Sequence, residues 1–252
     1  MEEKPSAFKR VTWGPIAAIG VTVLVYFAAQ ILGSILAGIY PLLQGWSVDR
    51  TTDWLAHSVH AQFIMVLLVE VITVWFIWLY LRHKKASFRD IGLRKPQIRD
   101  IGLAIAGFAA YFAIYLVTLT VIKSFVPGLN LEQEQELGFS KTTVGWSLGL
   151  IFVSLVILPP IVEEIVCRGF LYTGLRSKLA FLPAAIITSI MFACAHLQWG
   201  SGNALLWVAA IDTFILSMVL VYLRERTGAL GAPIFLHMIK NGLAFAVLFV
   251  IK

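Results

Sequence analysis

Long apolar stretches alternate with short polar segments along the whole chain. A helix that crosses a bilayer needs roughly 20 mostly apolar residues, and several stretches are about that long. They occupy approximately residues 13–39, 61–81, 101–122, 144–167, 182–199, 204–223 and 232–251. Each is continuously apolar rather than alternating, which favours helices over a membrane barrel. The pattern predicts an all-α polytopic membrane helix bundle of about seven transmembrane helices, forming a single membrane domain over residues 1–252.

Most basic residues fall in polar segments on one side of this bundle. Fifteen Lys and Arg residues lie in the N-terminal segment, 82–100, 168–180 and 224–231, against four on the opposite side. Cytoplasmic loops are enriched in Lys and Arg. The N-terminus is therefore expected in the cytoplasm, with the chain as a multi-pass protein of the plasma membrane. The polar segment 40–60 is expected to be an external loop.

Composition agrees with a membrane protein. Hydrophobic residues make up 59% of the chain and charged residues only 13%, whereas a typical soluble domain is about 25% charged. The net charge of +6 does not indicate a nucleic-acid partner, because the cations cluster in short loops. Cys167 and Cys194 lie within or beside apolar stretches, so neither a disulfide framework nor a thiol nucleophile is expected.

Two adjacent glutamates, Glu163 and Glu164, interrupt one apolar stretch. Ionisable residues inside a membrane are costly and by default mark a functional site. Arg168 follows Glu164 at the i, i+4 spacing of a favourable helical ion pair, which leaves Glu163 as the freer carboxylate and a candidate general base. Pro159 and Pro160 precede the pair. They predict a kink there, of the kind tolerated beside a water-filled cavity.

A second polar group can be placed at the same depth as Glu163. His196 lies in the next apolar stretch, and the natural turn between the two stretches is at residues 177–183. An antiparallel hairpin that turns there sets Glu163 level with His196, each roughly 24 Å from the turn at 1.5 Å per residue. The site is then expected within the membrane, reached from the cytoplasmic side.

The last apolar stretch carries His237 and Asn241, which share one helical face. Both can donate hydrogen bonds, so they are candidate oxyanion donors. Alternatively, Glu163, His196 and His237 supply a carboxylate and two imidazoles, a set found in catalytic zinc sites. The H-E-x-x-H layout is absent, and no cofactor is expected, although zinc stays open. Taken singly, such residues are also common as helix-to-helix hydrogen bonds; Glu70, alone in its stretch, has no clear role.

These motifs, in this order and on separate helices, resemble those of the CPBP intramembrane proteases, a family that contains type II CAAX prenyl endopeptidases and bacterial Abi proteins linked to bacteriocin processing and self-immunity. The resemblance covers roughly residues 140–245. It rests on three motifs: Glu163-Glu164-x-x-x-Arg168, Phe192-x-x-x-His196 and His237-x-x-x-Asn241.

The resemblance implies an all-helical protease that hydrolyses a peptide bond near the cytoplasmic membrane face. By matching position it assigns water activation to Glu163 with help from His196, and a supporting role to Glu164 and Arg168. His237 and Asn241 would stabilise the oxyanion.

Partners implied by this reading are the lipid bilayer and a peptide or a prenylated, lipid-associated protein. Two other functions stay open on the sequence alone. One is a non-catalytic immunity or binding protein on the same fold. The other is a transporter or proton relay, in which buried Glu and His are also common, although no inverted repeat is visible.

Overall fold

The structure, a computed structural model, describes residues 11–128, 130, 133, 138–140, 143–198 and 205–251. Every regular element in these residues is a helix. The first four are α1 (Pro15–Leu43), α2 (Val48–His57), α3 (Val59–His83) and α4 (Ile98–Phe125). A long broken helix follows, made of α5 (Ser147–Phe152), η2 (Val153–Ile157), α6 (Leu158–Glu164), η3 (Ile165–Leu171) and α7 (Tyr172–Arg176), where η marks π-helical turns. The last are α8 (Phe181–Ala195), α9 (Trp207–Thr227), α10 (Gly231–Phe245) and η4 (Ala246–Val250).

The predicted polytopic helical bundle is confirmed. Within the described residues, six helices are long and apolar enough to cross a membrane, and α8 is a shorter apolar helix. The span that carries the glutamates runs continuously from Ser147 to Arg176, so it extends past Arg168 as the hairpin argument required. Many large apolar side chains on the outer helix faces are exposed, Ile16 and Phe27 among them. Lipid, not water, would cover such faces of a membrane bundle.

The polar segment 40–60 is not simply a loop, because it contains α2. Ser47 caps this helix by accepting a hydrogen bond from the Arg50 backbone N–H at 3.3 Å. Asp49 lies in its first turn, where a negative charge is favourable. These are local signals of a helix start, and hydropathy alone overlooks them.

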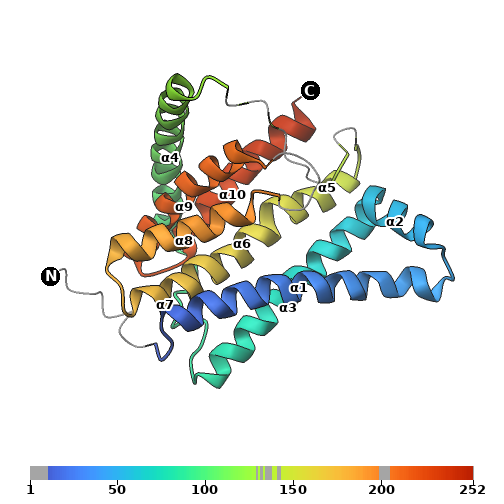
Figure 1. Cartoon of the computed structure of the whole chain (residues 1–252), viewed down its shortest axis with the longest axis horizontal. Helices are drawn as coiled ribbons and strands as arrows, with labels where there is room; N and C mark the ends of the chain where they lie inside the picture. The colour runs from blue at the N-terminus through green and yellow to red at the C-terminus, as the bar shows by residue number, and fades with distance from the viewer. Residues whose placement is uncertain are drawn as a thin grey trace.

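The broken helix lies at the centre of the bundle, as Figure 1 shows. It contacts α1 and α3 on one side and α8 and α10 on the other, while α4 packs against α9 and α10. Its departure from α-helical geometry at η2 comes just before Pro159, where the sequence predicts a kink. The second π-helical turn, η3, directly follows the glutamates and was not predicted. Such turns are frequent at functional sites.

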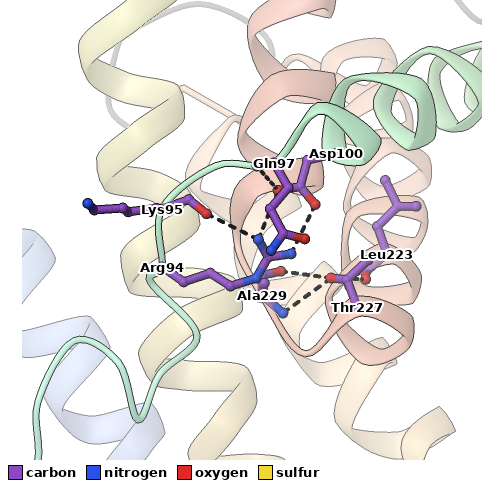
Figure 2. Close-up of polar contacts among 7 residues, drawn as sticks. All are labelled: Arg94, Lys95, Gln97, Asp100, Leu223, Thr227 and Ala229. Carbon is purple, nitrogen blue, oxygen red and sulfur yellow. Dashed lines mark hydrogen bonds and ion pairs between the residues drawn. The ribbon is translucent and has the colours of Figure 1, made fainter.

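One end of the bundle, here called the basic end, comprises loop 84–97, the turns 177–180 and 228–230, and the helix ends next to them: the start of α4, α7 and the last turn of α9. Figure 2 shows part of it: Arg94 donates to both carboxylate oxygens of Asp100, at 3.2 and 3.0 Å, and the Gln97 N–H donates to the same side chain. The Leu230 N–H donates to the Gly92 carbonyl at 2.9 Å, which ties the loop to the start of α10. The basic end is therefore closed by hydrogen bonds. The N-terminal residues Lys4, Lys9 and Arg10 lie outside the described residues.

Arg224 on α9 strengthens this closure from inside. Its guanidinium is fully buried and donates to the backbone carbonyl of Arg168 at 3.2 Å and to the Thr173 hydroxyl at 3.3 Å. Gly92 has φ +91°, and a Cβ at this position would approach the Arg224 guanidinium carbon to 2.7 Å. Glycine is therefore required here both for backbone conformation and for space.

Candidate active site

The centre of the site is a buried ion pair. Glu164 and Arg168 are both fully buried, and an Arg168 Nη1 hydrogen bond to Glu164 Oε1 of 2.9 Å joins them, which confirms the predicted i, i+4 pair. The Arg168 guanidinium also lies 4.3 Å from the centre of the Phe192 ring. This cation–π contact favours the cation most where water is excluded. The ion pair holds the Glu164 side chain in place and does not involve the neighbouring Glu163 carboxylate.

His237 on α10 connects the two glutamates. Its Nδ1 lies 3.0 Å from Glu164 Oε1, and its Nε2 lies 3.7 Å from Glu163 Oε2. Because a carboxylate accepts hydrogen bonds, Nδ1 carries the proton in this contact, and in neutral His237 the Nε2 presents a lone pair towards Glu163. A carboxylate behind an imidazole orients the ring. The Glu164 contact therefore fixes which ring nitrogen of His237 faces Glu163.

His196 forms the C-terminal cap of α8, on the wall of the same cavity. Its Nδ1 is 2.8 Å from the Phe192 carbonyl oxygen, which can only accept, so Nδ1 donates and Nε2 is left as an acceptor. The Phe192 ring lies between the two imidazoles. Its centre is 4.6 Å from the centre of the His196 ring and 5.8 Å from the centre of the His237 ring. The shared face predicted for Phe192 and His196 is thus used to orient the imidazole.

Glu163 is the least constrained carboxylate of the site. Its side chain is one-third exposed and lines the cavity, while Oε2 is buried without a hydrogen-bond partner in the described part of the chain. A buried carboxylate oxygen that lacks a partner is costly unless water or a ligand supplies one. The freer position predicted for Glu163 agrees with this geometry.

Asn241 has a contact that its sequence position did not suggest. Its Nδ2 donates to the Leu155 carbonyl at 2.9 Å. Leu155 lies four residues before Pro159, and an α-helical partner for this carbonyl would be the N–H that proline lacks. Asn241 therefore satisfies a backbone group freed by the proline. Asn241 also lines the cavity with His237, and its contact with Leu155 uses only one of its two amide hydrogens.

The cavity has a volume of about 440 Å³. Four of the six candidate site residues, Glu163, His196, His237 and Asn241, line it directly, while Glu164 and Arg168 lie buried behind His237 and Phe192. The remaining lining residues come from η2, α6, α9, α10 and η4, together with one residue before the broken helix: Leu155, Pro159, Thr213, Leu216, Lys240, Ala244, Phe245, Leu248, Phe249 and Gln133.

The expected access from the cytoplasmic side stays a prediction. The buried Glu164–Arg168 pair lies next to the cavity without lining it.

Sequence reasoning missed Asp212, a carboxylate inside the α9 span. Lys240 forms an ion pair with Asp212 Oδ2 at 3.1 Å, and the Tyr111 hydroxyl donates to the other carboxylate oxygen. Lys240 lines the cavity and is matched by this counter-ion. Asp212 could have been found by the rule that singled out the glutamates, because it too interrupts an apolar stretch. Glu70 on α3 does not line the cavity but lies within electrostatic reach of Glu163.

Among the described residues, no group of three or more His, Cys, Asp or Glu side chains is arranged to hold a metal ion. Neutral His196 and His237 nevertheless both direct Nε2 lone pairs to the cavity side, so the zinc alternative is left to experiment. Cys167 is partly buried and Cys194 exposed; neither is in a disulfide bond within the described residues, and neither lines the cavity.

Comparison with known proteins gives three matches. A family model described as Type II CAAX prenyl endopeptidase Rce1-like matches residues 145–243. The "Putative membrane peptidase YdiL" of Bacillus subtilis (strain 168) is 28% identical over 200 residues, 78% of this chain and 75% of that protein. An "Uncharacterized 24.3 kDa protein" of Escherichia coli is 33% identical over 91 residues, 35% of this chain and 40% of that protein. No solved structure matches.

Fold and cavity together define an integral membrane protein in which carboxylate and imidazole side chains line a cavity inside the helical bundle. The matches confirm the resemblance to the CPBP intramembrane proteases and support a membrane protease at the level of the family.

Proposed function

We propose that this chain is an intramembrane endopeptidase in which Glu163 activates water. The observation that carries the proposal is the Glu163 carboxylate, which faces a cavity walled by two imidazoles and whose buried Oε2 lacks a hydrogen-bond partner in the described residues. A water molecule would satisfy that oxygen and be positioned for proton transfer. We further propose that this integral membrane protein resides in the plasma membrane.

The proposed reaction proceeds in two steps. Water gives a proton to Glu163 while its oxygen attacks the carbonyl carbon of the peptide bond, which forms a tetrahedral oxyanion. The proton then passes to the amide nitrogen, the C–N bond breaks, and a carboxylic acid and an amine leave. His196 Nε2 is an acceptor on the cavity wall and can relay the proton.

Two groups are available to stabilise the oxyanion. Asn241 has an amide hydrogen that is not used by the Leu155 carbonyl. His237 can donate from Nε2 only in its protonated form, because Nδ1 already donates to Glu164. Glu164 and Arg168 act behind His237 by fixing its ring and balancing its charge. The resemblance assigns both His237 and Asn241 to the oxyanion, and the proposal adds that the two donate under different conditions.

The substrate is proposed to be a peptide segment, with or without a lipid. A larger apolar groove of about 940 Å³ lies between α4 and α9. It uses Ala210, Ile211 and Ile215 of α9, whereas the catalytic cavity uses Thr213 and Leu216. The groove therefore does not extend the cavity, and its apolar lining suits a bilayer lipid as well as a prenyl chain. Peptides made with and without a prenyl group would decide whether the lipid contributes.

The proposal can be tested on purified protein in lipid nanodiscs. A digest of membrane proteins would be incubated with wild-type protein, and new peptide ends would be identified by mass spectrometry. Glu163→Gln keeps the shape of the side chain and removes its basicity, so cleavage should fall at least ~10²-fold, the scale of general-base catalysis. Glu70→Gln is the matched control: it removes a nearby carboxylate that does not line the cavity.

The outcomes separate the candidate functions. Cleavage by wild type and Glu70→Gln but not by Glu163→Gln supports the proposal. Equal cleavage by Glu163→Gln would overturn the role of that residue. Retention of peptides by all three proteins without any new ends would instead favour the non-catalytic binding protein.

A further inference from the structure

One ion pair at the catalytic cavity has no part in the proposed reaction. The Lys240 ammonium on α10 lies 3.1 Å from Asp212 Oδ2 on α9, and the Tyr111 hydroxyl of α4 donates to Asp212 Oδ1. All three residues belong to helices that are long and apolar enough to cross a membrane. Charged side chains in such helices are costly, and by default they mark a functional site.

A structural role accounts for only part of this arrangement. The ion pair joins α9 to α10, and Tyr111 adds α4, so the three residues hold these helices together. However, an ion pair removed from water adds little net stability, and apolar side chains of similar volume often serve as well. Helix packing alone therefore does not explain why one member of the pair lies on the wall of the cavity.

Lys240 is the member of the pair that a ligand can reach. It lines the cavity, whereas Asp212 and Tyr111 line neither the cavity nor the groove between α4 and α9. Its side chain is 24% exposed. An ammonium group has three N–H donors, and Asp212 is the only ion-pair partner of Lys240 within the described residues. Lys240 therefore has donors left for a group that enters the cavity.

The charge of Lys240 is distinctive among the described residues that line the cavity, because it is the only Lys or Arg side chain there. Arg168 is fully buried and already paired with Glu164. Hydrogen bonds between ionised groups are roughly twice as strong as those between neutral groups. Asp212 holds the ammonium group in place before any ligand arrives, which lowers the entropy cost of binding.

We infer that Lys240 binds a carboxylate of the peptide substrate. Lys240 follows His237 at the i, i+3 spacing, at which Cβ atoms on a helix are about 5–6 Å apart. The bound carboxylate would therefore lie within a few residues of the peptide bond that is cleaved. The negative charge of Glu163 disfavours an anion elsewhere in the cavity, so the position of the carboxylate is restricted to the surroundings of Lys240.

An acidic side chain and a C-terminal carboxylate both supply this chemistry, and the test distinguishes them. Only the word substrate rests on the proposed function, because carboxylate binding can occur without cleavage.

Binding would be measured on the Glu163→Gln protein in lipid nanodiscs, which is expected not to cleave its ligands. The probes are four apolar peptides that carry a neutral fluorophore at the N-terminus. Two have no acidic side chain and end either in a carboxylate or in an amide. The other two end in an amide and carry either Asp or Asn at the central position. Fluorescence anisotropy gives the dissociation constant of each peptide.

We expect a carboxylate peptide to bind at least ~10-fold more tightly than its amide partner, because hydrogen bonds to charged groups are stronger than neutral ones. The peptide pair that shows this preference identifies the source of the carboxylate. Adding Lys240→Gln/Asp212→Asn removes both charges together, leaves neither unpaired, and should abolish the preference. Lys240→Arg should retain it. Lys95→Gln is the matched control, since it removes an exposed cation of loop 84–97 and should change nothing.

Two results would overturn the inference. One is equal affinity within both peptide pairs, or no binding of any of the four peptides, in the Glu163→Gln protein. The other is a preference that survives the loss of the Lys240 charge, which would reduce the ion pair to a contact between α9 and α10. If the variant with both charges removed does not fold, Lys240→Met removes the cation alone and leaves Asp212 bonded to Tyr111.

The proposed function fails or stands separately. Carboxylate binding through Lys240 without cleavage by the wild-type protein would contradict the protease and leave this inference intact. Cleavage without any carboxylate preference would support the protease and overturn the role of Lys240.

Discussion

The basic end and the cavity both contain charged side chains, but the carboxylates of the two regions differ in how many hydrogen bonds they receive. At the basic end, Glu225 receives three hydrogen bonds from Arg176, of 2.8, 3.1 and 3.3 Å, and one from the Tyr172 hydroxyl at 2.6 Å. In the cavity, Oε2 of Glu163 has no such donor among the described residues. Fully paired buried charges act as structure, whereas an unpaired carboxylate is available for chemistry. Glutamate thus has a structural role at Glu225 and a proposed catalytic role at Glu163.

The largest effects should come from removing one glutamate at each location. Glu163→Gln should lower peptide cleavage at least ~10²-fold and leave unfolding unchanged, because its Oε2 has no described partner to lose. Glu225→Gln should leave cleavage per folded molecule unchanged but lower the free energy of unfolding by about 3–5 kcal/mol, because Arg176 then stays buried without its counter-ion. Denaturation in detergent and peptide cleavage would be measured on both.

A shared outcome would remove this contrast. If Glu225→Gln lost as much activity per folded molecule as Glu163→Gln, the basic end would be part of the catalytic machinery and not only its support.

His237→Ala tests the residue that connects the buried Glu164 to the Glu163 of the cavity. If protonated His237 is an oxyanion donor, kcat should fall roughly 10²–10³-fold with little change in substrate affinity. Elemental analysis of wild type and variant, together with activity after chelation, tests the zinc alternative. We expect no stoichiometric metal. Stoichiometric zinc in the wild type that is lost in His237→Ala would contradict the oxyanion role.

Asn241→Leu should combine a structural and a catalytic loss. The Leu155 carbonyl would lose its donor, at about 1–3 kcal/mol of stability. Adding Pro159→Ala supplies a backbone N–H near that carbonyl and should recover part of the stability. Activity should stay low in the double variant if the second amide hydrogen contacts the oxyanion. Recovery of both properties together would reduce Asn241 to a structural residue.

The smallest effect is expected from the cysteines. Neither thiol lines the cavity, and thiols in apolar surroundings are poor nucleophiles. Cys167→Ser/Cys194→Ser should therefore cleave at the wild-type rate within about twofold, a difference of less than ~0.5 kcal/mol. An inactive but folded double variant would revive the thiol mechanism, and circular dichroism would establish the fold.

Local spacing explains what could be predicted of the site. The Glu164–Arg168 pair depends only on the turn of one helix, and the depth of His196 depends only on the length of one hairpin. The hydrogen bond between His237 and Glu164 joins residues 73 positions apart. No periodicity in a single sequence specifies that contact, so the resemblance could assign His237 a role but not its partner.

The helix α2 was not predicted because hydropathy shows only that residues 40–60 are polar. Ser47 and Asp49 signal the start of this helix. The side of the membrane from which the cavity is reached stays a prediction.

The π-helical turn η3 has a consequence for how this sequence can change. Its wider hydrogen-bonding pattern accommodates one residue more than an α-helical turn, between the glutamates and the anchored end of the broken helix. Removing one residue from Ile165–Leu171 can therefore close this turn to regular pitch and leave Glu163 and Glu164 in nearly the same angular phase relative to Tyr172 and Arg176. A second deletion has no wide turn to absorb it and would rotate the glutamates by about 100°. The segment should tolerate the loss of one residue far better than the loss of two.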